Sequence, residues 1–186
     1  MNNTRFVERC VVSDDKLYRY VLEVRIAPLE KPTKKLVVIQ KNPSTADQFT
    51  TDQTVRRVEN WARGKGFTTV KYLNLFAFRS KEPKALNNQQ YDVIVGDEND
   101  KVLADEINTT DTVIIGWGNP NNIRRAYYNK RSREVHQLIV KVIGQINVVG
   151  VITNDGYPRH GLMWQDKWTV STIENSSVFA YMKNIY

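Results

Sequence analysis

Apolar residues near the N-terminus fall at every second position, which predicts two β-strands. Over residues 16–27 the side chains Tyr18, Tyr20, Leu22, Val24 and Ile26 alternate with more polar ones, the period of a strand with one buried face. The segment Phe6–Val12 is placed to pair with it as an antiparallel hairpin. Residues 28–35 are rich in proline and charge and predict a loop, so residues 1–35 form an N-terminal β extension.

From residue 36 onward, short apolar runs take turns with amphipathic segments. The runs predict strands at 36–39, 69–76, 112–117 and 146–152, and helical spacing predicts helices at 51–63, 97–107, 132–143 and 178–183. A continuous apolar run is typical of a strand covered on both faces of a parallel sheet. The sequence therefore predicts an α/β protein: a three-layer α/β/α sandwich with a central, mainly parallel four-stranded sheet, right-handed crossovers and the N-terminal hairpin. No repeat or linker divides it, so we expect a single domain, 1–186.

The charge balance favours a polyanionic partner. The 186-residue chain has 27 Lys and Arg against 20 Asp and Glu, a net charge of +7, which suits a nucleic acid or a nucleotide. Basic residues gather between Arg124 and Arg133 around Tyr127 and Tyr128. A nucleic-acid surface and a solvated start of a helix explain this cluster equally well.

The single cysteine and the two histidines limit the chemistry of the chain. Cys10 alone cannot form an intrachain disulfide or a cysteine-based zinc site, and this favours a reducing compartment. No apolar run approaches the length that spans a bilayer. We therefore expect a cytoplasmic protein without a membrane partner, metal or cofactor, whose oligomeric state is left open.

Unusual polar and aromatic residues follow each of the four predicted strands from residue 36 onward. Ligands of open α/β sheets bind beyond the carboxyl ends of the strands, so these loops predict one shared pocket. The candidate residues, in chain order, are Asn42, Pro43, Ser44, Asp47, Asn74, Phe76, Arg79, Trp117, Gly118, Arg159 and His160.

Each loop also has an ordinary structural interpretation. Asn42, held beside the rigid Pro43, can orient a ligand or a water, but the same loop can be a turn with Ser44 capping a helix. Asp47 is a candidate general base or a cap, and we interpret Asp52 as a cap. His160 has the chemistry of a proton donor near neutral pH and equally that of a surface hydrogen-bonding residue.

The later loops carry the same two interpretations. Asn74 beside Phe76 can read the polar edge of a stacked ring, although the phenyl ring can instead belong to the core. Arg79 is placed to meet a phosphate. Trp117 next to Gly118 offers a flat surface with close backbone approach.

Several motifs together resemble a known family. They are Asn-Pro-Ser-Thr-Ala-Asp at 42–47, Asp-Gln-Thr-Val-Arg-Arg at 52–57, Asn-Leu-Phe-Ala-Phe-Arg at 74–79, Gly-Asp-Glu-Asn-Asp at 96–100, Gly-Trp-Gly at 116–118 and Asp-Gly-Tyr-Pro-Arg-His at 155–160. This set resembles an uncharacterised bacterial and phage family, a domain of unknown function. Its layout is in turn similar to the uracil-DNA glycosylase superfamily.

The second resemblance implies roles for individual residues. Asn42 with Pro43 would position an attacking water, and His160 would hydrogen-bond the departing base. Phe76 or Phe78 would stack on a flipped base while Asn74 reads its edge, in a reaction that needs no metal.

The leading hypothesis from the sequence is a glycosylase-like protein that recognises a nucleobase in DNA or in a nucleotide and hydrolyses an N-glycosidic bond. The first alternative is a non-catalytic, phage-related protein that binds a nucleotide or a nucleic acid. The second is a hydrolase of modified nucleotides in which Asp47, Asp97 and Asp100 hold a divalent ion.

Overall fold

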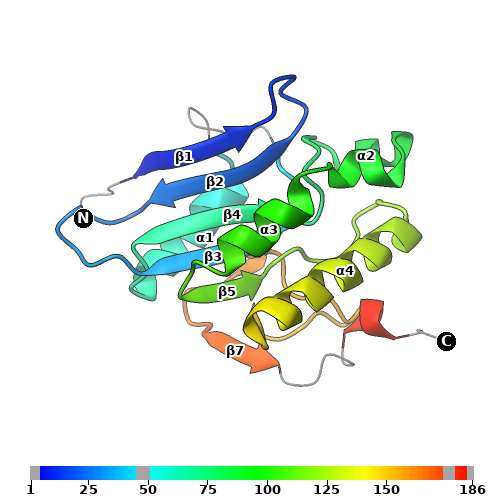
Figure 1. The fold of residues 1–186 in the computed structure, drawn as a ribbon. Coiled ribbons are helices and arrows are strands. Elements are labelled where there is room, and N and C mark those ends of the chain that lie inside the picture. Colours follow the sequence, from blue (N-terminus) through cyan, green and yellow to red (C-terminus); the bar gives the residue numbers. More distant parts are fainter. Residues whose placement is uncertain (1–4, 45–50, 174–178, 184–186) are drawn as a thin grey trace.

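The computed structural model describes residues 5–44, 51–173 and 179–183. Over these ranges the chain alternates strands and helices, as Figure 1 shows. In chain order the elements are β1 (Phe6–Val12), β2 (Arg19–Arg25), β3 (Lys35–Gln40), α1 (Gln53–Gly64), β4 (Thr69–Asn74), the 3-10 helix η1 (Pro83–Asn88), α2 (Tyr91–Val95), α3 (Asn99–Ile107), β5 (Thr112–Ile115), α4 (Arg125–Ile143), β6 (Ile146–Val149), the 3-10 helix η2 (Gly161–Met163), β7 (Val170–Ile173) and the 3-10 helix η4 (Ala180–Met182).

The main sheet has five strands in the order β1-β2-β4-β3-β5 and is mixed. Its strands β4, β3 and β5 are parallel, whereas the predicted N-terminal hairpin β1-β2 joins it through an antiparallel pairing of β2 with β4. The predicted central sheet of four parallel strands is therefore not confirmed. The fourth expected strand, β6, pairs instead with β7 in a separate antiparallel pair, because residues 170–173 supply a partner that their short, partly polar sequence did not reveal.

Helices cover both faces of the main sheet, which confirms the α/β class. On one face, Val58 and Trp61 of α1 pack against a cluster that includes Val38 of β3. On the other face, α3 and α4 enclose a cluster that includes Ile39 of β3 and Leu73 of β4. Figure 1 shows α1 behind the sheet and α3 and α4 in front of it. Neighbouring residues of β3 thus face opposite layers, and this explains its continuous apolar run.

Helix α4 begins at Arg125, earlier than the predicted start at Ser132. The reason is that Tyr128 and Arg131 continue its buried face toward the N-terminus, and the Arg131 guanidinium donates to the Leu75 carbonyl oxygen at 2.6 Å. A buried arginine looks like a surface charge in a sequence. The other predicted helices from 51 to 107 agree with α1 and α3 to within the usual fraying of helix ends.

The predicted C-terminal helix at 178–183 is present as a single 3-10 turn, η4. Within the described part of the chain, no helix is long and apolar enough to cross a membrane.

Candidate functional site

A pocket of about 210 Å³ opens where β3 and β4 end. Its wall combines the ends of β2, β3 and β4, the start of α1 and the loops that follow β4, β5 and β6. The lining residues are Arg19, Gln40, Lys41, Asn42, Ser44, Asp52, Thr54, Val55, Tyr72, Asn74, Ser80, Lys81, Pro83, Asn121 and His160. Four residues chosen from the sequence, Asn42, Ser44, Asn74 and His160, therefore lie together.

Two buried amide side chains form the floor of this pocket. Gln40 and Asn74 are partners in register on the parallel strands β3 and β4, so their side chains leave the same face of the sheet about 5 Å apart. They are only 6% and 1% exposed. Neither amide nitrogen nor either amide oxygen has a hydrogen-bond partner among the described residues. Buried polar groups are normally paired, so four unpaired atoms side by side favour a ligand with its own donors and acceptors.

The Asn42 loop is braced by the chain after β4. Asn42 Nδ2 donates to the carbonyl oxygens of Pro43 and Ser80, at 3.1 and 3.0 Å, and the Ser80 N–H donates to the Pro43 oxygen at 2.9 Å. These bonds orient the amide of Asn42. Its Oδ1 receives no hydrogen bond from a described residue and is the atom that can accept one from a water or a ligand.

The predicted cap is confirmed beside this loop. Asp52 is the N-cap of α1, and its Oδ1 accepts the N–H of Val55 at 2.8 Å. Its second oxygen accepts a hydrogen bond from the Ser44 hydroxyl. Ser44 therefore bonds to the residue that caps α1, whereas the short helix that Ser44 or Thr45 could cap falls outside the described residues.

His160 reaches the pocket from the loop that follows β6. The Gly161 N–H donates to the Gly116 carbonyl oxygen at 3.2 Å, which ties this loop to the end of β5. His160 Nδ1 accepts the N–H of Leu162 at 3.3 Å, so the proton of the neutral ring is on Nε2. Burial, with a further contribution from the charge of Lys41, lowers the pKa of His160 to about 4. At neutral pH His160 is therefore an uncharged hydrogen-bond donor.

Two buried cations give the pocket a positive potential. Arg19 is 3% exposed, and burial lowers its pKa to about 10, so it remains charged. Lys41 is 4% exposed, and burial lowers its pKa to about 8. Its Nζ lies 5.6 Å from the centre of the Tyr128 ring. Such a pocket favours a ligand that is anionic or becomes so.

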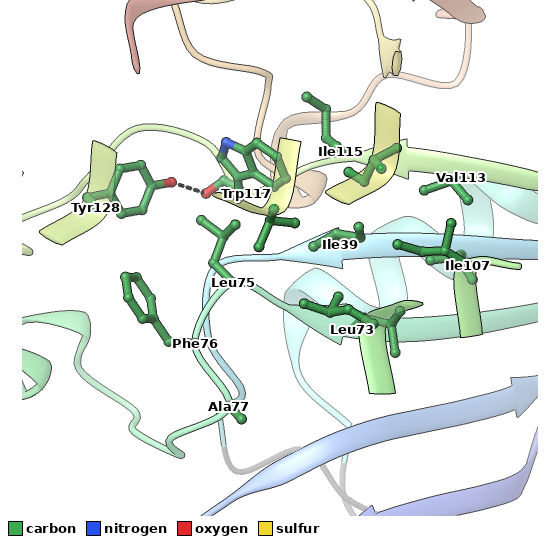
Figure 2. Packing of buried hydrophobic residues seen from close by; sticks show 14 of the residues in the cluster. Ile39, Leu73, Leu75, Phe76, Ala77, Ile107, Val113, Ile115, Trp117 and Tyr128 are labelled. Carbon is green, nitrogen blue, oxygen red and sulfur yellow. Dashed lines mark hydrogen bonds between the residues drawn. The ribbon is translucent and has the colours of Figure 1, made fainter. Parts of the chain in front are cut away.

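Phe76 and Trp117, both expected to stack on a ligand, lie in the core. Each is 0% exposed, and Figure 2 shows them packed with Tyr128, whose hydroxyl donates to the Trp117 carbonyl oxygen at 3.1 Å. Neither lines the pocket. An aromatic residue at a strand end has the same sequence signature in both settings, because apolar faces suit the core and a ligand ring alike.

Four further candidates lie outside the pocket lining: Pro43, Arg79, Gly118 and Arg159. The Pro43 carbonyl oxygen accepts the hydrogen bond from Asn42 Nδ2, and Gly118 contacts His160. Arg159 donates to the Val151 carbonyl oxygen at 3.1 Å and stacks on Trp168, and Arg79 is fixed through its backbone to Leu17. Gly118 has a positive φ of 71°, and a Cβ added there would lie 2.8 Å from the His160 Cβ. Gly118 therefore sets the position of His160.

The proposed carboxylate site for a divalent ion gains no support from the described residues. Asp97 and Asp100 line a different pocket together with Lys130 and Arg131, and Arg131 Nη2 lies 2.6 Å from Asp100 Oδ1. Asp47 lies outside the described residues. In the described ranges no group of three or more His, Cys, Asp or Glu side chains is arranged to hold a metal.

Gln40, Lys41 and Arg19 are buried polar residues of the pocket that the sequence analysis did not select. The position of Gln40 and Lys41 in the chain could have identified them, because they continue the buried apolar strand β3 and are themselves buried. A polar residue at that point looks like the start of an exposed loop. Only the register with β4 brings Gln40 next to Asn74.

The comparisons with known proteins give a family but no activity. Neither the search of curated proteins nor the search of solved structures gave a match to this chain. The model of a family described as a protein of unknown function, DUF1643, matches residues 19–162, which include β2 to η2 and every residue that lines the pocket. The chain therefore belongs to the DUF1643 family.

Proposed function

We propose that the pocket binds a nucleobase, in DNA or in a nucleotide, and that the protein hydrolyses the bond between the base and its sugar. The observation that carries this proposal is the pair of unpaired amides of Gln40 and Asn74. Nucleobases present donors and acceptors side by side along one planar edge. Two adjacent amides, each with donor and acceptor, are complementary to such an edge.

The resemblance to uracil-DNA glycosylases assigns the chemical steps. Asn42 Oδ1 accepts a hydrogen bond from the water that attacks C1′ of the sugar, while Nδ2 is held by Pro43 and Ser80. The bond between C1′ and the base nitrogen breaks, and its electron pair leaves with the base. His160 donates from Nε2–H to the departing base, and Arg19 stabilises the developing negative charge.

A neutral histidine suits this role better than a protonated one. Burial is the main cause of the lowered pKa of His160, and the charge of Lys41 adds to it, so an imidazolium would be costly in this pocket. A neutral donor still forms a hydrogen bond that strengthens as charge grows on the base.

The test is a panel of oligonucleotides that carry uracil or modified bases, incubated without added metal and then heated in alkali to cleave abasic sites. We expect cleavage with the wild-type protein and none with His160→Gln or Asn42→Ala. His136→Gln is the matched control, because His136 is the other histidine and lies in the core on α4.

Other outcomes would replace the proposal. Tight binding of nucleotides without base release from any member of the panel would make the protein a binder. Base release or phosphate hydrolysis only with magnesium would favour the metal-dependent hydrolase.

A further inference from the structure

Lys41 is a buried amine that the proposed hydrolysis does not use. It comes directly before Asn42, and both residues line the pocket. Among the described residues its Nζ has no carboxylate within ion-pair distance and no hydrogen-bond acceptor, and it lies over the ring of Tyr128. Burying a lysine without a counter-ion lowers the stability of a protein, so a lysine of this kind in a ligand pocket is a candidate for a role in binding or reaction.

The environment of Lys41 makes it a nucleophile. Burial disfavours the ammonium form, and a pKa of about 8 in place of 10.5 raises the neutral fraction at pH 7 by roughly 300-fold. The neutral amine carries the lone pair that attacks a carbonyl carbon. Lys81, which lines the same pocket, is exposed.

We propose that Lys41 forms an imine with the aldehyde of an abasic sugar, the product that base release leaves in the pocket. This inference rests on the proposed function, because the reacting carbon is the C1′ that Asn42 would address with water. Both residues line the same pocket, so a sugar bound there lies within reach of a buried amine as well as of the amide that would position the water.

The reaction balances without another reagent. In the ring-opened sugar, the Lys41 nitrogen forms a bond to C1′, and the carbonyl electron pair moves to oxygen, which takes a proton. The resulting carbinolamine loses water as the nitrogen lone pair forms the C=N bond. One amine and one aldehyde thus give one imine and one water, and hydrolysis reverses the reaction and releases the sugar.

The experiment uses the full-length protein, DNA with a preformed abasic site and sodium borohydride, which reduces an imine to a stable amine. We expect a covalent protein–DNA adduct, and peptide mapping should find it on Lys41. Lys41→Met and Lys41→Arg should reduce the adduct at least about tenfold, because neither side chain offers a neutral amine at pH 7. Lys101→Arg is the matched control, because Lys101 is exposed on α3 and does not line the pocket, and this variant should retain the adduct.

The rate of trapping should rise with pH and level off above about pH 8, where Lys41 is neutral. A lysine of ordinary pKa would give a rate that still rises above pH 9. Adduct that persists in folded Lys41→Arg, or a wild-type protein that gives no adduct, would overturn the inference. Because the abasic site is preformed, trapping is scored separately from base release, so the failure of either proposal is recognised on its own.

Discussion

Replacing Asn74 by leucine should make the protein more stable while removing its ability to bind a base. Asn74 is 1% exposed, and in the part of the chain that the structure describes both polar atoms of its amide lack a partner. An unsatisfied buried polar group costs about 1–3 kcal/mol, and leucine has a similar size without the polar atoms. We expect a gain of about 1–2 kcal/mol in the free energy of unfolding, because pocket solvent offsets part of the cost.

Thermal unfolding followed by circular dichroism measures this change. For a chain of this length, about 1–2 kcal/mol corresponds to a rise in Tm of about 2–8 °C. The same preparation should show no base release from the oligonucleotide panel and no binding of nucleotides. Gain of stability with loss of binding is typical of a residue kept for a ligand.

Asn147→Leu is the matched control. Asn147 is also buried, but its Nδ2 donates to the Val113 carbonyl oxygen at 3.0 Å and its Oδ1 accepts the Thr172 hydroxyl at 2.8 Å. Removing this amide leaves both partners unpaired, so the free energy of unfolding should fall by about 1–3 kcal/mol. If Asn74→Leu lowers Tm as Asn147→Leu does, then Asn74 has a structural role and the argument from its unpaired atoms is refuted.

Three other substitutions test the surroundings of the site. Gly118→Ala should displace His160 and slow base release about 10- to 100-fold. Gly144→Ala is the control, because Gly144 has a similar positive φ but open space around it, and this variant should lose stability alone. Equal rates of base release in the two variants would contradict the role of Gly118. Burial lowers the pKa of His136 to about 4. Between pH 6.5 and 4 the unfolded state therefore binds a proton that the folded state does not. The free energy of unfolding should fall by up to about 3 kcal/mol as the pH drops through this range. Urea unfolding at pH 7 and pH 4 measures that loss, which His136→Gln should reduce; an unchanged loss would assign it to other groups. Asp52→Ala should lower Tm by about 2–4 °C because α1 loses its N-cap, and an unchanged Tm would show that the cap is replaceable.

The positions of several elements follow from local pattern, because burial on one or both faces imposes a period on the sequence. The apolar run of β3 and the cap at Asp52 agree with the structure. The strand β2 is also confirmed, but it is buried on both faces and not on one, because its polar residues are covered as well. The rule that polar loops gather at the carboxyl ends of parallel strands also brought Asn42 and Asn74 together correctly.

The predicted start of α4 was wrong because arginine occurs both in buried and in exposed environments. Arg131 is almost completely buried and bonds to a backbone carbonyl, but a sequence presents it as part of a basic surface cluster. Phe76 and Trp117 show the reverse case, since residues expected at a ligand are fully buried. Composition does not separate these settings, because the partner that satisfies each side chain comes from a distant part of the chain.

By itself, then, the sequence determined β1 to β6, the helices α1 and α3, the C-terminal part of α4, the α/β class and four of the residues that line the pocket. Only the tertiary structure decided that β6 pairs with β7, that Gln40 lies beside Asn74, and that Lys41 and Arg19 are buried cations next to His160. The physical reason is the separation along the chain of the residues that are in contact. Periodicity shows which face of its own helix or strand each residue occupies. Strand order, register and the burial of a charge depend instead on contacts between segments that are far apart in the chain.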